Sequence, residues 1–289
     1  GGGGGSGSGS GGGNHLRVRI SGDSMARQFF CRMMLFLGGS TVLDSIPNIG
    51  IDFFTATYVL FVDGSVSFRA TGTSSRFVDK FGSISVDGED VGAEALFVIS
   101  YHYDHSRSPK RFPANGYIDL HFHFLTYHDV HVAERHTYDA FFGTIRKRLA
   151  DNKTLSPAKT VIVTLPPTNR AGNNSNASLR EYYRARNIEV TTLVNAINKD
   201  FPNGRFHTFD AAGLSDVLEA TTIAHGRTAA TSSTGGLRCD GVHYACNMRP
   251  MAPNVGHLYS SSCPHFQHCR DDFNVLLAQV VAQVSLSFW

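Results

Sequence analysis

The chain has 289 residues, of which 42% are hydrophobic and 17% charged, and this composition indicates a globular protein with a sizeable core. The formal net charge of +2 comes without a basic patch that carries interleaved aromatic residues, so nothing in the sequence points to nucleic-acid binding. No segment reaches the roughly 18 uninterrupted apolar residues that a membrane span needs. Any membrane anchor or signal peptide is therefore expected only upstream of residue 1.

Residues 1–13 contain only glycine and serine, which predicts a flexible linker. Residues 14–289 are then long enough to form one large domain. Short apolar runs alternate with helical patterns along this domain, which is typical of a mostly parallel sheet. The predicted fold class is α/β, with a three-layer α/β/α sandwich.

The expected strands and helices follow from the spacing of apolar residues in chain order. The strands are Leu16–Ile20, Tyr58–Val62, Leu96–Ser100, Thr160–Leu165 and Arg205–Phe209. The helices are Met25–Phe36, Tyr138–Leu149, a segment around Leu193–Ile197, and Phe273–Val284. An Asn/Ser-rich loop is expected over residues 168–178, after the fourth of these strands.

The tripeptide Gly22-Asp23-Ser24 directly follows the first expected strand and precedes the first expected helix. Ser24 should therefore lie at the carboxyl end of a parallel sheet, where open α/β proteins bind ligands. A helix N-terminus also favours developing negative charge, which suits a nucleophile whose attack creates an oxyanion. The alternative is that Asp23 and Ser24 serve only as ordinary N-cap residues.

A second segment, Cys239-Asp240-Gly241-Val242-His243-Tyr244, places a carboxylate three residues before an imidazole. In a tight turn, Asp240 can bind Nδ1 of His243 and leave Nε2 to face Ser24, which is the arrangement an ester-cleaving serine needs. The alternative is a surface Asp-Gly turn with an incidental histidine.

The stretch from His102 to His136 is rich in histidine, and we interpret it as an insertion near the candidate site of Ser24. We expect it to form a hairpin at the rim of that site. Within it, strand alternation puts Asp119, His121 and His123 on one face. A divalent metal site is the less favoured interpretation, because no strict ligand spacing is present. The candidate ligands are Asp119, His121, His123, His128, His131 and His136, with a second set at Cys263, His265, His268 and Cys269.

Four of the five cysteines lie close together near the C-terminus, and three N-glycosylation sequons occur upstream of them. This combination favours a protein of the secretory pathway, in the Golgi lumen or outside the cell, with two disulfides around the Asp240 segment. The alternative is that the sequons are chance matches and the thiols are reduced. The disulfide candidates are Cys239, Cys246, Cys263 and Cys269, Cys31 has no assigned partner, and the glycosylation candidates are Asn152, Asn173 and Asn176.

Gly22-Asp23-Ser24 after the first strand, with Asp240 and His243 near the C-terminus, resembles the SGNH (GDSL-type) hydrolase superfamily. The longer segments 22–28 and 240–244 resemble its PC-esterase branch, which includes the trichome birefringence-like polysaccharide O-acetyltransferases of plants. The resemblance implies an SGNH-like catalytic domain over residues 14–289. It further implies an acyl-enzyme on Ser24, with His243 as general base and then acid and Asp240 as the orienting carboxylate.

What the resemblance implies for function is an esterase or O-acyltransferase, most simply for acetyl groups, acting on carbohydrate hydroxyls without a cofactor. The partners would be a carbohydrate or polysaccharide substrate and, for a transferase, an acyl donor. The sequence has no feature that decides between water and a sugar hydroxyl as the final acceptor. Arg27 recurs in the family's longer motif, and it either binds an anionic substrate group or buttresses the loop.

One departure from the family concerns the oxyanion hole, which members usually support with an Asn and a Gly in the loop after the third strand. The segment 99–103, which is expected to form that loop, contains neither residue. Candidate donors are the backbone N–H of Ser24, then Gly72, with His102 as a substitute. The departure motivates an alternative function, a degenerate SGNH fold that binds glycans or another partner without catalysis.

Overall fold

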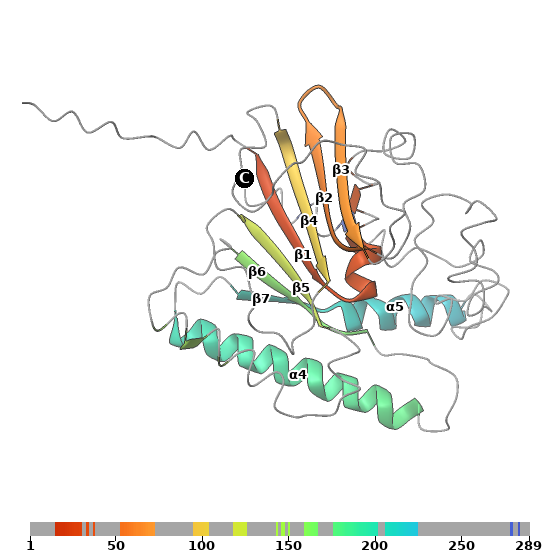
Figure 1. Cartoon of the computed structure of the whole chain (residues 1–289). Coiled ribbons are helices and arrows are strands. Elements are labelled where there is room, and N and C mark those ends of the chain that lie inside the picture. Colours follow the sequence, from red (N-terminus) through yellow and green to blue (C-terminus); the bar gives the residue numbers. More distant parts are fainter. Residues whose placement is uncertain are drawn as a thin grey trace, which may run out of the picture.

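The computed structural model describes residues 15–30, 33–34, 37, 53–72, 95–103, 118–125, 143, 146–147, 150, 159–166, 176–201, 206–224, 278–279 and 283. These residues build an α/β fold around a seven-stranded sheet in the order β3-β2-β4-β1-β5-β6-β7 (Figure 1). The strands are β1 Leu16–Gly22, β2 Phe53–Phe61, β3 Val66–Gly72, β4 Ala95–Tyr103, β5 Leu120–Phe124, β6 Lys159–Val163 and β7 Phe206–Phe209.

The sheet is mixed but mostly parallel. β1 pairs in parallel with β4 on one side and with β5 on the other, and β6 and β7 continue the parallel run. β2 is antiparallel to both β3 and β4. The predicted α/β class with a mostly parallel sheet is confirmed, whereas the antiparallel strand β3 was not predicted.

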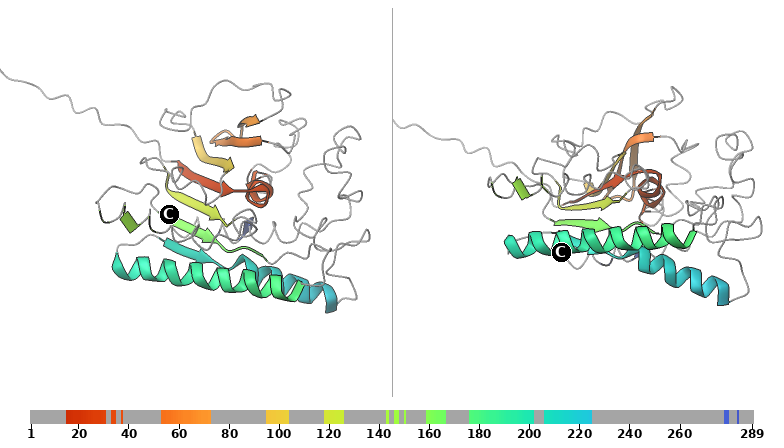
Figure 2. Two further views of the ribbon diagram at one scale, coloured as in Figure 1. Left: turned by 60° about the horizontal axis from the view of Figure 1, so that its bottom comes forward. Right: turned by 90° about the horizontal axis from the view of Figure 1, so that it is seen from below.

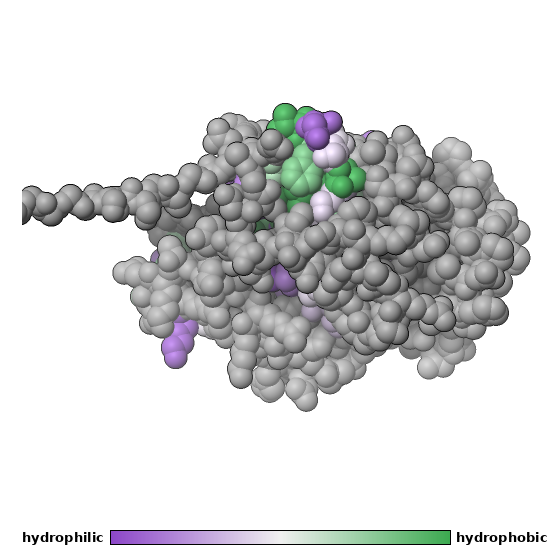
Figure 3. All heavy atoms as spheres, turned by 45° about the horizontal axis from the view of Figure 1, so that its top comes forward, coloured by the Kyte–Doolittle hydropathy of each residue, from purple (hydrophilic) through white to green (hydrophobic). Residues whose placement is uncertain are grey.

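The turn between β2 and β3 explains why these strands form a hairpin. Gly64 adopts a φ of 80° there, which a residue without a side chain tolerates. The carboxylate of Asp63 accepts a hydrogen bond from the backbone N–H of Ser65 at 2.8 Å, an Asx turn. Val62 beside them is 70% exposed, and Figure 3 shows this end of the molecule, where apolar and polar described residues lie side by side.

Two long helices lie beside β7, at the end of the sheet remote from β3 (Figure 2). They are α4, Asn176–Asp200, and α5, Ala211–Ala224. α4 buries Tyr183, Asn187, Val190, Val194 and Ile197, which fall on one face at helical spacing. α5 was not predicted from the sequence. Within the described ranges, no helix combines the length and apolarity needed to cross a membrane.

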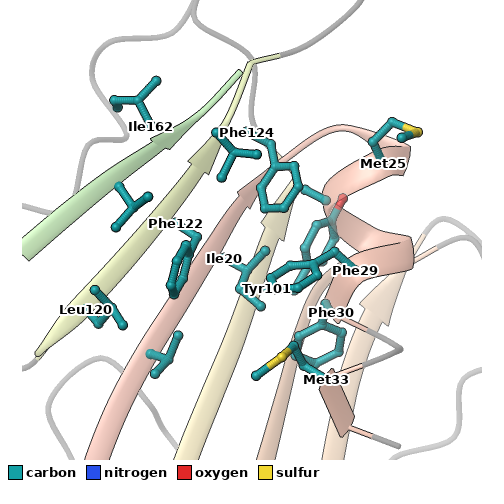
Figure 4. Close-up of a cluster of buried hydrophobic side chains, with 14 of the residues drawn as sticks. Ile20, Met25, Phe29, Phe30, Met33, Tyr101, Leu120, Phe122, Phe124 and Ile162 are labelled. Carbon is teal, nitrogen blue, oxygen red and sulfur yellow. The ribbon is translucent and has the colours of Figure 1, made fainter. Parts of the chain in front are cut away.

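A helix over residues 24–30 follows β1 and covers one face of the sheet (Figure 4). The ring of Phe29 lies edge-on to Phe122, at 6.2 Å between centroids, and 5.2 Å from Phe124. The rings of Phe30 and Tyr101 are also in contact, with their centroids 5.8 Å apart. These aromatic contacts fix the helix over β4, β1 and β5 and so determine where its first residue lies.

Several sequence predictions are corrected by these elements. The segment around His121 is not a hairpin at the rim of the site, because β5 is an inner strand whose five side chains are all buried. Residues 99–103 are not a loop but the second half of β4. The Asn/Ser-rich loop ends earlier than predicted, since α4 begins at Asn176. The three-layer sandwich stays a prediction, because much of the chain that would complete it lies outside the described residues.

Candidate active site

Ser24 lies where the order of the parallel strands reverses. After β1 the chain forms β2, β3 and the parallel strand β4 on one side of it, and then the parallel strands β5, β6 and β7 on the other. In open α/β sheets this switch point is where ligands bind, outside the carboxyl ends of the strands. Ser24 is half-buried and is the first residue of the helix that begins at this edge.

Asp23 caps this helix. Its side chain is 1% exposed, and its Oδ1 accepts a hydrogen bond from the backbone N–H of Met25 at 2.9 Å. Its backbone carbonyl accepts the N–H of Arg27 at 3.1 Å, the first bond of the helix. The N-cap role therefore belongs to Asp23 and not to Ser24, which lies one position inside the helix.

Gly22 allows the strand to turn into the helix in very little space. Its φ is 149°, and a Cβ placed on it would lie 2.7 Å from Cβ of Phe124 and 2.8 Å from Cβ of Ala26. Both distances are shorter than real Cβ contacts, so any side chain would push β5 or the helix away. The glycine of the Gly-Asp-Ser motif is thus required by the approach of β5 to the turn.

Tyr101 of β4 supports the same turn from the other side. It is fully buried and pairs in register with Ile20 of β1. Its hydroxyl lies 3.3 Å from the carbonyl of Gly22 and 3.1 Å from the carbonyl of Asp23. Sequence reasoning missed this residue because it placed position 101 in a loop. The alternation Tyr101-His102-Tyr103 beyond Ser100, with tyrosines that favour strands, was the signal that could have extended the strand to include it.

The structure does not bring Gly72 to Ser24. Gly72 ends β3, and β2 and β4 separate that strand from β1. At roughly 4.8 Å between neighbouring strands, the separation is about 14 Å. Gly72 is therefore poorly placed to donate to an oxyanion at Ser24.

His102 is closer in the sheet, but its side chain belongs to the other face. It pairs with Ser21, one residue before Gly22, and it follows Tyr101, whose side chain points to the helix. Because neighbouring residues of a strand alternate between faces, His102 lies on the face away from the helix. Its predicted role as a substitute donor is not supported by this placement.

Arg27 is 7% exposed and belongs to the first turns of the helix. Because Arg27 is buried, the structure favours the interpretation that it supports the loop over the interpretation that it binds an anionic substrate group. The other predicted site residues, Asp240 and His243, lie outside the described residues, so their predicted approach to Ser24 is not tested. The same holds for Cys31, Cys239, Cys246, Cys263, Cys269, Asn152 and Asn173, whereas Asn176 is the first residue of α4.

On the sheet face away from the helix, Ser21 is bound by two imidazoles. Its Oγ lies 2.7 Å from Nε2 of His121 and 3.0 Å from Nδ1 of His123, and all three side chains are buried. Burial is the main reason that the pKa of His121 falls well below its usual value, and the nearby His123, Arg19 and His102 lower it further. The predicted shared face of His121 and His123 is confirmed.

The alternative metal interpretation gains no support in the part of the chain that the structure describes. No group of three His, Cys, Asp or Glu side chains there is arranged to hold a metal ion. Asp119 is exposed, and its Oδ2 accepts a hydrogen bond from the backbone N–H of Arg17 at 2.8 Å. His128, His131, His136, His265 and His268 lie outside the described residues.

No protein-family model and no curated protein matches the chain. Among solved structures, it is similar to Est24, a carbohydrate acetylesterase from Sinorhizobium meliloti, at 14% sequence identity. The match covers 95% of this chain and 100% of that chain, with a TM-score of 0.39. A likeness this weak establishes neither a shared fold nor a shared activity.

Proposed function

We propose that the chain is a serine-dependent esterase or O-acyltransferase that moves an acyl group, most simply acetyl, on or off carbohydrate hydroxyls. The observation that carries the proposal is the position of Ser24, at the first residue of a capped helix and at the switch point of the sheet. A hydroxyl there meets both the ligand-binding edge and the positive end of the helix dipole.

The proposed chemistry uses Asp240 and His243 as the partners of Ser24. The Oγ of Ser24 bonds to the acyl carbon while its proton passes to Nε2 of His243. Collapse of the tetrahedral intermediate breaks the ester C–O bond, and His243 returns the proton to the leaving alcohol. Water or a sugar hydroxyl then attacks the acyl carbon and gives its proton to His243. Collapse of this second intermediate breaks the bond between Ser24 Oγ and the acyl carbon, and His243 returns the proton to Oγ.

The backbone N–H of Ser24 is the proposed donor to the oxyanion, because it lies at the N-terminus of the helix. The alternative of a non-catalytic domain was motivated by segment 99–103, which belongs to β4 and not to a loop. That observation therefore no longer favours the alternative. The carbohydrate substrate and a secretory location, with disulfides and glycosylation, remain part of the proposal on the sequence motifs alone.

Labelling with a serine-directed fluorophosphonate tests the nucleophile. We expect the wild-type protein to be labelled and Ser24→Ala not to be labelled. Ser65→Ala is the matched control, because this serine lies exposed in the β2–β3 turn and should leave labelling unchanged. A folded wild-type protein that resists labelling would instead support a binding domain.

Acetate release and transfer test the reaction. The protein is incubated with acetylated and non-acetylated polysaccharides, with and without an acyl donor, and acetyl groups are followed by mass spectrometry. Loss of acetyl groups without a donor indicates an esterase, and gain of acetyl groups with a donor indicates a transferase. We expect His243→Ala to lower turnover by several orders of magnitude without unfolding the domain.

A further inference from the structure

We infer that Tyr101 is a positioning residue for the reaction at Ser24, because its hydroxyl orients the peptide group whose N–H would bind the oxyanion. This inference rests on the proposed function and extends it to a residue of a different strand. Tyr101 belongs to β4, and its side chain reaches across to the turn that follows β1 (Figure 4).

Two donors among the described residues hold the carbonyl of Asp23. They are the hydroxyl of Tyr101 at 3.1 Å and the backbone N–H of Arg27 at 3.1 Å. The peptide group that contains this carbonyl also contains the N–H of Ser24. In a planar trans peptide the two groups point in opposite directions, so whatever fixes the carbonyl also fixes the N–H.

The direction of the Ser24 N–H follows from the direction of this carbonyl. The Asp23 carbonyl points along the helix, as its bond to Arg27 requires. The N–H of Ser24 therefore points out of the helix N-terminus, toward the carboxyl edge of the sheet where substrate would bind. Rotation of this peptide group would turn the N–H away from that edge and would break the bond to Tyr101.

Tyr101 is itself held firmly in place. Its ring is fully buried and lies 5.8 Å from that of Phe30, and its backbone pairs with Ile20. The hydroxyl has one proton to donate, and it shares this proton between the carbonyl of Asp23 at 3.1 Å and that of Gly22 at 3.3 Å. A fixed hydroxyl of this kind adds a second donor to the Asp23 carbonyl and so opposes fraying of the first helical turn.

Tyr58 provides a matched control for the loss of a buried hydroxyl. It lies on β2, next to β4, is fully buried and pairs with Ile99. Among the described residues its hydroxyl has no hydrogen-bond partner, and burial raises its pKa to about 12. Tyr58→Phe therefore removes the same atom from the same sheet without touching the turn before Ser24.

The test compares wild type, Tyr101→Phe and Tyr58→Phe in the hydrolysis of p-nitrophenyl acetate and in the rate of fluorophosphonate labelling. Removing a whole oxyanion donor costs about 100- to 1,000-fold, so misorienting one should lower kcat by roughly 10-fold. We expect Tyr101→Phe to show this loss with KM changed by less than about twofold, and to lower the affinity for phenylboronic acid, a tetrahedral mimic, in parallel. Tyr58→Phe should match wild type in all three measurements.

The outcomes separate this inference from the function it rests on. If wild type hydrolyses the ester but Tyr101→Phe keeps the kcat of Tyr58→Phe, the positioning role is wrong and the proposed function stands. If neither wild type nor Tyr58→Phe reacts with ester or fluorophosphonate, both proposals fail. If Tyr101→Phe does not fold, 3-fluorotyrosine at position 101, which keeps the hydroxyl and strengthens it as a donor, must alter kcat, whereas the same replacement at position 58 must not.

Discussion

The hydroxyl of Ser21 lies 2.7 Å from Nε2 of His121, so a buried hydrogen bond joins β1 to β5 close to the candidate nucleophile. Nδ1 of His123 lies 3.0 Å from the same oxygen. A hydroxyl has one proton to donate, so it donates to one ring and accepts from the other. This arrangement needs at least one neutral imidazole, and the low pKa of His121 favours its neutral form.

Acid should destabilise the fold through His121. Burial and the nearby His123, Arg19 and His102 hold its pKa well below the usual value of 6.5. The unfolded chain therefore binds a proton that the folded chain excludes, so this contribution to stability is complete above pH 6.5 and is lost as the pH falls below it. We expect the free energy of unfolding, measured with denaturant, to fall steadily between about pH 7 and pH 5.

The control for this prediction is a histidine in a different environment. His121→Gln should remove much of the pH dependence of the free energy of unfolding. His207→Gln, at an exposed position on β7, should leave that pH dependence unchanged. An equal slope in wild type and His121→Gln would show that other groups cause the acid sensitivity.

A glycine series separates steric and conformational effects at the turn. Gly22→Ala meets Phe124 and Ala26 at under 3 Å and also requires an unfavourable φ, so we expect it to cost about 3 kcal/mol or more, or to prevent folding. Gly64→Ala has open space around it and is opposed only by its φ of 80°, about 1–2 kcal/mol. Gly143 is a helical residue with open space around it, so Gly143→Ala should raise the free energy of unfolding by up to about 1 kcal/mol.

Thermal and denaturant unfolding of the three variants measure this order. If Gly22→Ala proved no worse than Gly64→Ala, the close contact between the turn and β5 would not hold in the folded protein. The expected rank is therefore a direct check on the geometry that places Ser24.

The sequence predicted most of the parallel sheet because its strands are apolar runs between turn signals, as in Leu16–Ile20. It mistook β5 for an insertion, because His121 and His123 read as polar surface. Their burial depends on Ser21, which is 100 positions from His121, and a local pattern cannot reveal such a partner. α5 was missed although Leu214, Val217 and Leu218 have helical spacing, because its buried positions are the small residues Ala211, Ala212 and Ser215, which do not mark an apolar stripe.

At the candidate site, Gly22, Asp23 and Ser24 could be identified because a contiguous motif carries them. Tyr101 could not, because its role depends on the pairing of β4 with β1 and on a side chain reaching to backbone carbonyls. A hydrogen bond from a side chain to backbone groups 78 positions away leaves no local sequence pattern. The assignment of Asp240 and His243 rests on their spacing and on the family resemblance of their motif, and it stays a prediction.

The helix cap should matter for both stability and reaction. Asp23→Ala removes the acceptor for the N–H of Met25 and should lower stability by about 1–2 kcal/mol. Asp23→Asn keeps an oxygen acceptor at the same position and should cost less than about 0.5 kcal/mol. On the proposed function, kcat should fall for the alanine variant and change little for the asparagine variant, because the cap orders the turn of Ser24. Equal kcat values for both variants would contradict this link.

Asn187 should be costly to replace, more so than an exposed polar residue of α4. It lies in the buried stripe of that helix, where its side chain accepts the N–H of Leu165 at 3.0 Å and donates to the carbonyl of Leu165 at 2.9 Å. Asn187→Leu leaves the buried N–H and carbonyl of Leu165, just after β6, without these hydrogen bonds. It should therefore lower the free energy of unfolding by about 2–4 kcal/mol. Asn195→Leu makes the same change at an exposed position of α4 and should cost less than about 0.5 kcal/mol. Similar losses in the two variants, measured by denaturant unfolding, would mean that the contact between α4 and Leu165 adds little to the fold.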